Sequence, residues 1–133
     1  RIIRIVSMAV GGIGAISLLV GSLGILTIMW ISVNERTSEI GLARAVGATS
    51  GQILLLFLSE AALLSMLGGI LGVGLGLGVA GLLHLYVPAL PVHTPIEYVF
   101  LALLVSLVVG IASGLLPARR ASTLDPVVAL AAE

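Results

Sequence analysis

Ionisable residues are few in this chain, and their types and spacing limit the chemistry that it could perform. Its 133 residues carry no net charge, no lysine and no cysteine. A P-loop needs a lysine on the nucleotide phosphates, disulfide and thiol chemistry needs cysteine, and nucleic-acid binding needs a basic field. No Ser-His-Asp arrangement or pair of carboxylates indicates catalysis, and His84 and His93 have no further ligand nearby at metal spacing. We therefore predict no catalytic, cofactor-binding or metal-binding residue and no nucleic-acid partner.

A short polar segment, residues 34–52, interrupts the apolar sequence. It reads NERTSEIGLARAVGATSGQ and contains four of the twelve charged residues. A helix over residues 35–46 would place Glu35 and Glu39 near its N-terminus and Arg44 near its C-terminus, as the helix macrodipole favours. Gly47 can end this helix in a left-handed conformation, and the sequence TSGQ at 49–52 predicts a capping box that begins the next helix.

One face of this predicted helix combines acidic and apolar residues. On a 3.6-residue wheel Glu35, Glu39, Leu42 and Val46 lie together. Such modest amphipathicity fits a helix that lies along a membrane surface or in the groove of a partner protein. It also fits a solvated connecting turn, which composition alone favours.

Glu60 is the one acidic residue deep within an apolar stretch. An ionisable group inside a membrane is by default a functional hypothesis, such as a proton or ion site. If the helix around Glu60 protrudes from the membrane, the carboxylate lies at the interface and needs no such role. Both interpretations stay open at this point.

The elements that must position these residues are membrane-spanning helices. The chain is 59% hydrophobic and 9% charged, whereas soluble domains are about a quarter charged. A chain of this size cannot bury so much apolar surface in a core of its own. We therefore predict an all-α membrane protein with three transmembrane helices, a short helix in the polar segment and a short C-terminal helix that Asp125 and Pro126 begin.

The order of these elements follows from the apolar stretches and the helix signals between them. We expect a span at 5–33, the polar segment at 34–49, a long span at 50–87, a loop at 88–94, a span at 95–116 and a polar tail at 117–133. At the start of the third span, Thr94 would cap the helix, Pro95 would take the first helical position and Glu97 would complete a capping box. Pro117 would end this span.

Small residues recur at every fourth position in the second and third spans. The rows are Gly68, Gly72, Gly76 and Ala80, and Ala102, Ser106, Gly110 and Gly114. Small side chains let helix backbones approach closely in lipid. These rows therefore predict that the two helices pack together, and the alternative is a second span that is flexible or kinked.

Charge predicts which side of the membrane the polar segment faces. Arg36 and Arg44 would lie on the same side as Arg119 and Arg120, whereas the connection between the second and third spans has no Arg or Lys. The positive-inside rule then places the polar segment and the C-terminus in the cytoplasm. Arg119 and Arg120 would anchor the third span at the membrane surface. The two arginines near the N-terminus count against this orientation unless they adjoin a folded domain outside.

Two motifs resemble the signatures of a known family. NERTSEIGLARAVGAT at 34–49 and GLLPARRASTLDPVVALAAE at 114–133 are similar to the cytoplasmic and closing signatures of the FtsX-like permeases, the MacB-type branch of ABC transporters. They stand in the right order, two spans apart, and the resemblance covers nearly the whole chain. It implies that residues 1–133 are the C-terminal transmembrane domain of a four-span permease of the bacterial cytoplasmic (inner) membrane. The final VVALAAE departs from the family pattern, which often has a charge there, so we assign those residues no role.

The resemblance implies mechanical transmission rather than enzymatic activity. The segment at 34–49 would be a coupling helix that docks on a separate or fused ABC nucleotide-binding domain. That domain would bind ATP and Mg, and the spans would carry its motion to an extracytoplasmic domain for export or extraction of a substrate. The other implied partners are a second permease, as homodimer or related heterodimer, membrane lipid and a possible periplasmic or extracellular protein. The coupling residues carried over to this chain are Glu35, Arg36, Glu39, Ile40, Gly41, Leu42, Arg44, Val46 and Gly47.

Two alternative functions stay open beside this one. The chain could be a regulatory membrane module, as in the cell-division branch of the same family, which controls cell-wall hydrolases. It could also be a secondary transporter that uses Glu60 as an ion or proton site.

Overall fold

The computed structural model describes residues 1–86 and 94–125, and these two ranges contain four α-helices and no strand. The helices are α1 (Ile2–Glu35), α2 (Thr37–Ala45), α3 (Ser50–Tyr86) and α4 (Ile96–Ser122). Three of them, α1, α3 and α4, are long and apolar enough to cross a membrane, which confirms the predicted all-α membrane class. The short C-terminal helix predicted after Asp125 lies outside the described residues.

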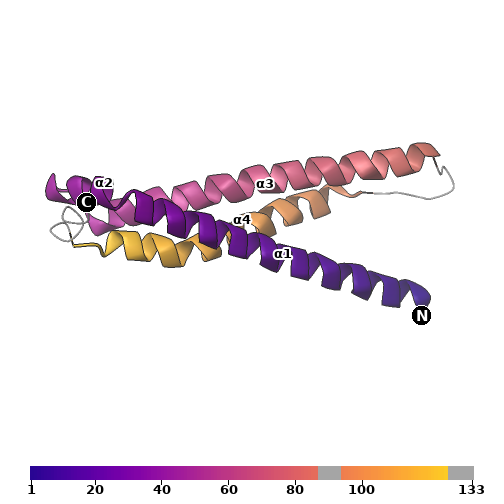
Figure 1. Cartoon of the computed structure of the whole chain (residues 1–133). Helices are drawn as coiled ribbons and strands as arrows, with labels where there is room; N and C mark the ends of the chain where they lie inside the picture. Colours follow the sequence, from indigo (N-terminus) through magenta and orange to yellow (C-terminus); the bar gives the residue numbers. More distant parts are fainter. Residues whose placement is uncertain (87–93, 126–133) are drawn as a thin grey trace.

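The long helices diverge from one end of the molecule. α3 and α4 lie antiparallel and side by side, whereas α1 crosses them at an angle and separates from α3 toward its own N-terminus (Figure 1). The short helix α2 lies where α1 and α4 end and α3 begins. We call this the α2 end, and we call the end with Tyr86 and the N-terminus the opposite end.

The buried core lies at the α2 end and draws on all four helices. It consists of Met29 and Val33 of α1, Ile40 of α2, Ile53, Phe57 and Ala61 of α3, and Ala118 and Ala121 of α4. Because this core fixes the four helices against one another only at the α2 end, that end is the packed unit of the chain.

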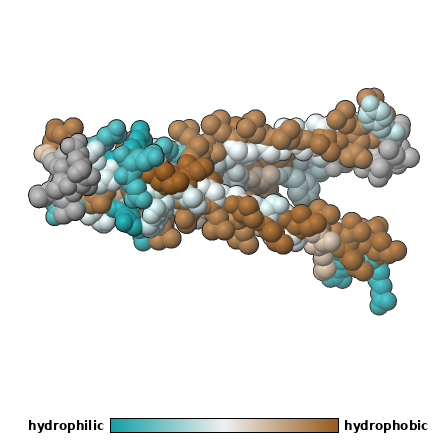
Figure 2. All heavy atoms as spheres, viewed as in Figure 1, coloured by the Kyte–Doolittle hydropathy of each residue, from teal (hydrophilic) through white to brown (hydrophobic). Residues whose placement is uncertain are grey.

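Toward the opposite end the apolar side chains are exposed. Ile3 on α1 is 83% exposed and Leu85 on α3 is 73% exposed. Figure 2 shows hydrophilic residues gathered over the α2 end and at the N-terminal tip, with hydrophobic residues covering most of the face between them. In a membrane, lipid chains are as apolar as these side chains, so their exposure to lipid carries no hydrophobic penalty.

α3 and α4 pack through residues so small that the backbones approach closely. A Cβ atom added to Gly110 would lie 2.1 Å from the Cβ of Ser65, and one added to Gly114 would lie 2.5 Å from the Cβ of Ala61. The hydroxyl of Ser106 donates a hydrogen bond to the carbonyl of Ser65, at 2.8 Å. The two helices thus pack together as the sequence predicts, and α4 contributes Ser106, Gly110 and Gly114 to the contact.

On α3 the contact uses a different row of small residues from the one that the sequence singled out. Ala61, Ser65 and Gly69 face α4. A Cβ atom at Gly68, Gly72 or Gly76 would meet no atom within 4 Å, and Ala80 lines a small hollow that Thr94 also lines. The two rows differ by a rotation of about 100° around the helix axis. Small residues occur in both rows, so the pattern by itself cannot choose between them.

The helix α4 does not end at Pro117, which corrects the sequence prediction. It continues to Ser122, and Pro117 lies inside it. A proline within a helix removes one hydrogen bond and costs about 3 kcal/mol. Pro117 is fully buried, and Ala118 and Ala121 after it are 0% exposed. Packing of this last stretch against the other helices therefore maintains a helix that local preference would end.

Of the two predicted capping boxes, the one at the start of α3 forms and the one at the start of α4 does not. The capping box at the start of α3 is formed, because the N–H of Thr49 donates to Oε1 of Gln52 (2.9 Å) and the N–H of Gln52 donates to Oγ1 of Thr49 (3.3 Å). The predicted capping box of α4 is absent. Pro95, with ψ 137°, precedes the helix instead of starting it, and no side chain caps the helix. The shift by one residue places Glu97 too early in the helix to complete the box with Thr94.

Candidate functional site

The helix α2 folds back along the first turns of α3. Gly47 makes the turn with φ +110°, a conformation that L side chains rarely adopt, as the sequence predicts. Helices of equal rise place residues at equal distances from a turn side by side. Arg36 and Glu60 are each twelve residues from Ala48, and their side chains meet across the two helices.

One face of α2 is buried and the other is exposed. Ile40, at 4% exposure, and Gly41 face inward, where Ile40 joins the core. Leu42 is 59% exposed and Val46 is 82% exposed. Two large apolar side chains therefore lie uncovered at the hydrophilic end of the molecule.

Two exposed acidic residues accompany them. Glu35 is exposed, and the side chain of Glu39 is 72% exposed. We call Glu39, Leu42 and Val46, the residue that directly follows α2, the outward face of α2; Glu35 is the last residue of α1, so the helix predicted over 35–46 begins two residues later. Of the other residues predicted to take part in coupling, Ile40 and Gly41 are buried.

Arg36 occupies the corner between α1 and α2 and contacts two carboxylates. It caps the C-terminus of α1 and the N-terminus of α2. Its Nε lies 3.5 Å from Oε2 of Glu39 on α2, and its Nη1 lies 3.7 Å from Oε2 of Glu60 on α3. Arg36 therefore connects three helices at one point.

Two further arginines connect the helices of the α2 end. Arg44 donates hydrogen bonds to the hydroxyl of Ser50 and to the carbonyl of Ser122, the latter at 3.4 Å. The guanidinium of Arg120 lies over the ring of Trp30, 4.8 Å from its centroid, a cation–π contact between α4 and α1. Arg119 is exposed beside it. The arginines that the sequence grouped by charge thus lie at one end of the molecule.

Two of these contacts were not predicted from the sequence. The Arg36–Glu60 ion pair had a usable signal, namely the equal distance of both residues along the chain from Ala48, next to the Gly47 turn. The contact between Trp30 and Arg120 had none, because nothing in the periodicity of α1 or α4 indicates which of their faces meet.

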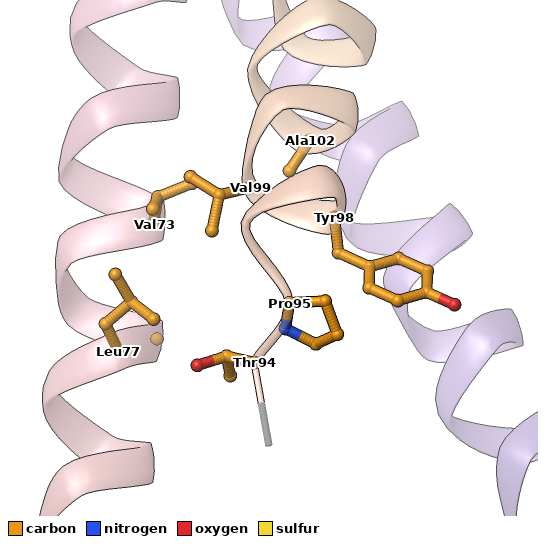
Figure 3. A pocket seen from close by; sticks show the side chains of 8 residues that line it. Val73, Leu77, Thr94, Pro95, Tyr98, Val99 and Ala102 are labelled. Atoms are coloured by element: carbon orange, nitrogen blue, oxygen red, sulfur yellow. The ribbon is translucent and has the colours of Figure 1, made fainter. Parts of the chain in front are cut away.

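Two hollows of the bundle away from the α2 end contain no acidic or basic side chain, and a third, near the opposite end, is lined by His84. The one in Figure 3 measures about 350 Å³ and lies between α3 and the start of α4. Val73 and Leu77 line it from one side and Pro95 and Val99 from the other, while the ring of Tyr98 points away from Val73 and Leu77. A second, of about 300 Å³, lies among α1, α3 and α4. The first is lined mainly by apolar side chains, and the hydroxyl-bearing residues Ser17, Ser22, Ser65 and Ser106 also line the second.

No metal-binding cluster of His, Asp and Glu forms among residues 1–86 and 94–125. His93 lies outside these ranges. At the α2 end Arg36 forms ion pairs with both Glu39 and Glu60. The α2 end is therefore the candidate functional site.

Comparison with known proteins gives matches over nearly the whole chain. Residues 11–126 match the family described as FtsX-like permease C-terminal. The chain is 47% identical, over 131 residues, to the macrolide export ATP-binding/permease protein MacB of Azoarcus sp. (strain BH72), which covers 96% of this chain and 19% of that protein.

Two other relatives differ in name and length. The chain is 46% identical over 127 residues to the pyoverdine export ATP-binding/permease protein PvdT of Pseudomonas aeruginosa, covering 96% of this chain and 19% of that protein. It is 42% identical over 130 residues to the uncharacterized ABC transporter permease YknZ of Bacillus subtilis (strain 168), covering 98% of this chain and 32% of that protein. The chain thus spans between 19% and 32% of the length of these relatives.

Proposed function

This chain belongs to the FtsX-like permease C-terminal family, and from that premise we propose that it transmits ATP-driven motion across the membrane. It is a permease component of a MacB-type ABC transporter. In our proposal α2 is the coupling helix, which receives motion from a nucleotide-binding domain. The long helices carry that motion to an extracytoplasmic domain, and the motion drives export or extraction of a substrate.

The outward face of α2 is the observation that supports this proposal most. Leu42 and Val46 are exposed there with Glu39, and Glu35 is exposed at the end of α1, although this end of the molecule is hydrophilic and the apolar core lies directly beneath. Exposed apolar residues rimmed by charge are typical of protein–protein contact sites. The matching surface on the nucleotide-binding domain would be an apolar groove with basic residues at its rim.

The inward residues of α2 would hold this face in place. Ile40 is buried in the core, Gly41 is also buried, and Gly47 turns the chain into α3. Arg44 fixes the end of α2 to α4 through the carbonyl of Ser122. We therefore divide the predicted coupling residues into docking residues on the outward face and supporting residues beneath it.

We propose that the α2 end faces the bacterial cytoplasm. Arg36, Arg44, Arg119 and Arg120 all lie at this end, whereas the sequence that connects α3 and α4 contains no Arg or Lys. The positive-inside rule favours the cytoplasmic side for such an end. Arg119 and Arg120, exposed near the end of α4, would interact with the lipid headgroups of the cytoplasmic (inner) membrane.

The partners of the whole transporter are also proposals. Two of the relatives are named ATP-binding/permease proteins, which supports an ABC nucleotide-binding domain, fused or separate, that binds ATP and Mg. Their names give two different export substrates, a macrolide and pyoverdine, so they support export and leave the substrate to be determined. A second permease copy, as homodimer or heterodimer, and an extracytoplasmic partner complete the proposed assembly.

The pairing of Glu60 favours transmission over ion transport. Its carboxylate lies against Arg36 at the α2 end, and the two hollows that Val73 and Ser65 line farther along the bundle contain no acidic or basic side chain. A secondary transporter would need a continuing series of polar or ionisable groups across the membrane. We therefore do not propose Glu60 as an ion site.

The proposal is tested in the complete transporter with Leu42→Asp and Glu39→Lys. A charge in an apolar docking groove should weaken association with the nucleotide-binding domain by about thirtyfold or more, as for the loss of a central contact residue. Stimulation of ATP hydrolysis by the permease should fall in parallel. Glu97→Lys is the control, since Glu97 lies in the first turn of α4, away from α2. Unchanged association and unchanged ATPase stimulation in both α2 variants would rule the proposal out.

A further inference from the structure

We propose that Glu60 is a positioning residue for transmission, because its ion pair with Arg36 makes α3 follow the motion of α2. This inference rests on the proposed function, since it requires α2 to be the helix that receives the motion. In this inference the Arg36–Glu60 ion pair transfers the motion from α2, the docked helix, to α3, the transmembrane helix beside it.

The packing between α2 and α3 leaves a role for such a pair. A hollow of about 280 Å³ lies between the two helices, and Arg36, Glu39 and Ile40 line it from α2 while Leu56 and Phe57 line it from α3. Protein interiors transmit displacement because they are closely packed. Ile40, Ile53 and Phe57 join the two helices in the core, and the hollow lies beside them, where Arg36 and Glu39 also line it.

The Gly47 turn joins α2 and α3 at one end of the hollow, and the ion pair joins them at the other. Arg36 stands at the far end of α2 from this turn, and its guanidinium reaches Glu60 on α3 at 3.7 Å. Without the pair, α2 would be joined to α3 through the turn, through the hydrogen bond from Arg44 to Ser50 beside that turn and through Ile40 in the core. A displacement of α2 could then rotate it about the turn and leave α3 in place.

The position of Arg36 makes the pair a connection among three helices. Arg36 ends α1 and begins α2, so a shift of α2 moves its guanidinium directly. Its second contact, with Glu39 at 3.5 Å, is made within the same chain segment and holds the guanidinium on α2. The contact with Glu60 is the one that crosses to α3.

Helix packing does not require an acidic residue at the position of Glu60. Its neighbours in α3 are apolar or small, its side chain is 40% exposed, and it adjoins Ala61, which is 0% exposed. A solvated surface helix could place an acid anywhere along its exposed side. Here the carboxylate lies at the height of Arg36, as the equal spacing from the turn requires.

The test separates docking from transmission in the complete transporter, reconstituted in lipid nanodiscs. The variants are Glu60→Gln, Arg36→Gln and the charge-swapped double variant Arg36→Glu with Glu60→Arg, and Glu97→Gln is the matched control. Docking is measured as association with the nucleotide-binding domain. Transmission is measured as the change in distance between spin labels at Ile3→Cys and Leu85→Cys when ATP and vanadate are added. These sites are exposed on α1 and α3 toward the opposite end, and this chain contains no cysteine of its own.

We expect Glu60→Gln to leave docking unchanged and to reduce the population that reaches the ATP-bound distance about twofold or more, as for the loss of one coupling contact. The swapped variant should restore that population, which an effect of Glu60 on folding alone would not do. Normal distance changes in Glu60→Gln, or a swapped variant as impaired as the single variants, would overturn the inference. A failure of the proposed function would give a different result, because Leu42→Asp would then leave association with the nucleotide-binding domain unchanged.

Discussion

Gly110→Ala tests the closest contact between α3 and α4. The added Cβ would lie 2.1 Å from the Cβ and 2.4 Å from the Oγ of Ser65, and 3.4 Å from the carbonyl oxygen of Ala61. To restore an ordinary contact, the helices would have to separate by roughly 1.3 Å at this point. Overpacking of this kind costs about 1–3 kcal/mol. We expect the upper part of that range, because Ser65 belongs to a helix that cannot move aside alone.

The loss of stability in Gly110→Ala is measured by heating the purified transporter. The readout is the fraction of the transporter that stays monodisperse after heating. A cost of about 3 kcal/mol corresponds to a roughly hundredfold change in an equilibrium constant. Gly72→Ala is the control, because its added Cβ meets no atom within 4 Å and alanine favours a helix over glycine by about 0.5–1 kcal/mol.

The double variant Gly110→Ala with Ser65→Gly removes both close atoms and keeps the carbonyl that Ser106 contacts. It should recover the stability of the Ser65→Gly variant. If Gly110→Ala proved as stable as Gly72→Ala, or if Ser65→Gly brought no recovery, the packing of α3 on α4 described above would be refuted.

Two further predictions concern the ends of the helices near α2. Thr49→Ala removes the hydroxyl that accepts the N–H of Gln52 and should lower stability by about 1 kcal/mol; the same heating assay checks it, and a stability equal to that of the unchanged protein would contradict the role of the cap. Arg120→Gln removes the guanidinium over Trp30 and should cost about 0.5–1 kcal/mol. The fluorescence of Trp30, the only tryptophan of this chain, should change with it in a single-tryptophan background, whereas Arg119→Gln should leave it unchanged.

Local signals around the polar segment were readable from the sequence because their causes lie within a few residues. Gly47 takes the left-handed turn since only glycine adopts it without strain, and Thr49 and Gln52 form a capping box since each is within reach of the other's backbone N–H. At the start of α4 the same reasoning failed by one residue. Pro95 fits either before or at the start of a helix, and nothing local decides between these positions.

The sequence predicted which segment contains the candidate site, but it did not predict which residues of that segment are exposed. The sequence placed Glu39, Leu42 and Val46 on one face of a short helix, and these residues are exposed together. It also grouped Ile40 and Gly41 with the coupling residues, and they lie on the buried side. A resemblance identifies positions along a motif, whereas burial depends on which neighbouring helices cover the segment.

By itself, the sequence determined that this chain is an all-helical membrane protein with a polar segment between its first two long helices. Apolar stretches of this length have no other way to satisfy their backbone groups in lipid, so composition was sufficient. The tertiary structure decided which row of α3 meets α4, that Pro117 lies within a helix, and that Glu60 meets Arg36. Each of these depends on the rotation and crossing of helices relative to one another. The packing of all the helices together sets those quantities, and the periodicity of a single helix does not contain them.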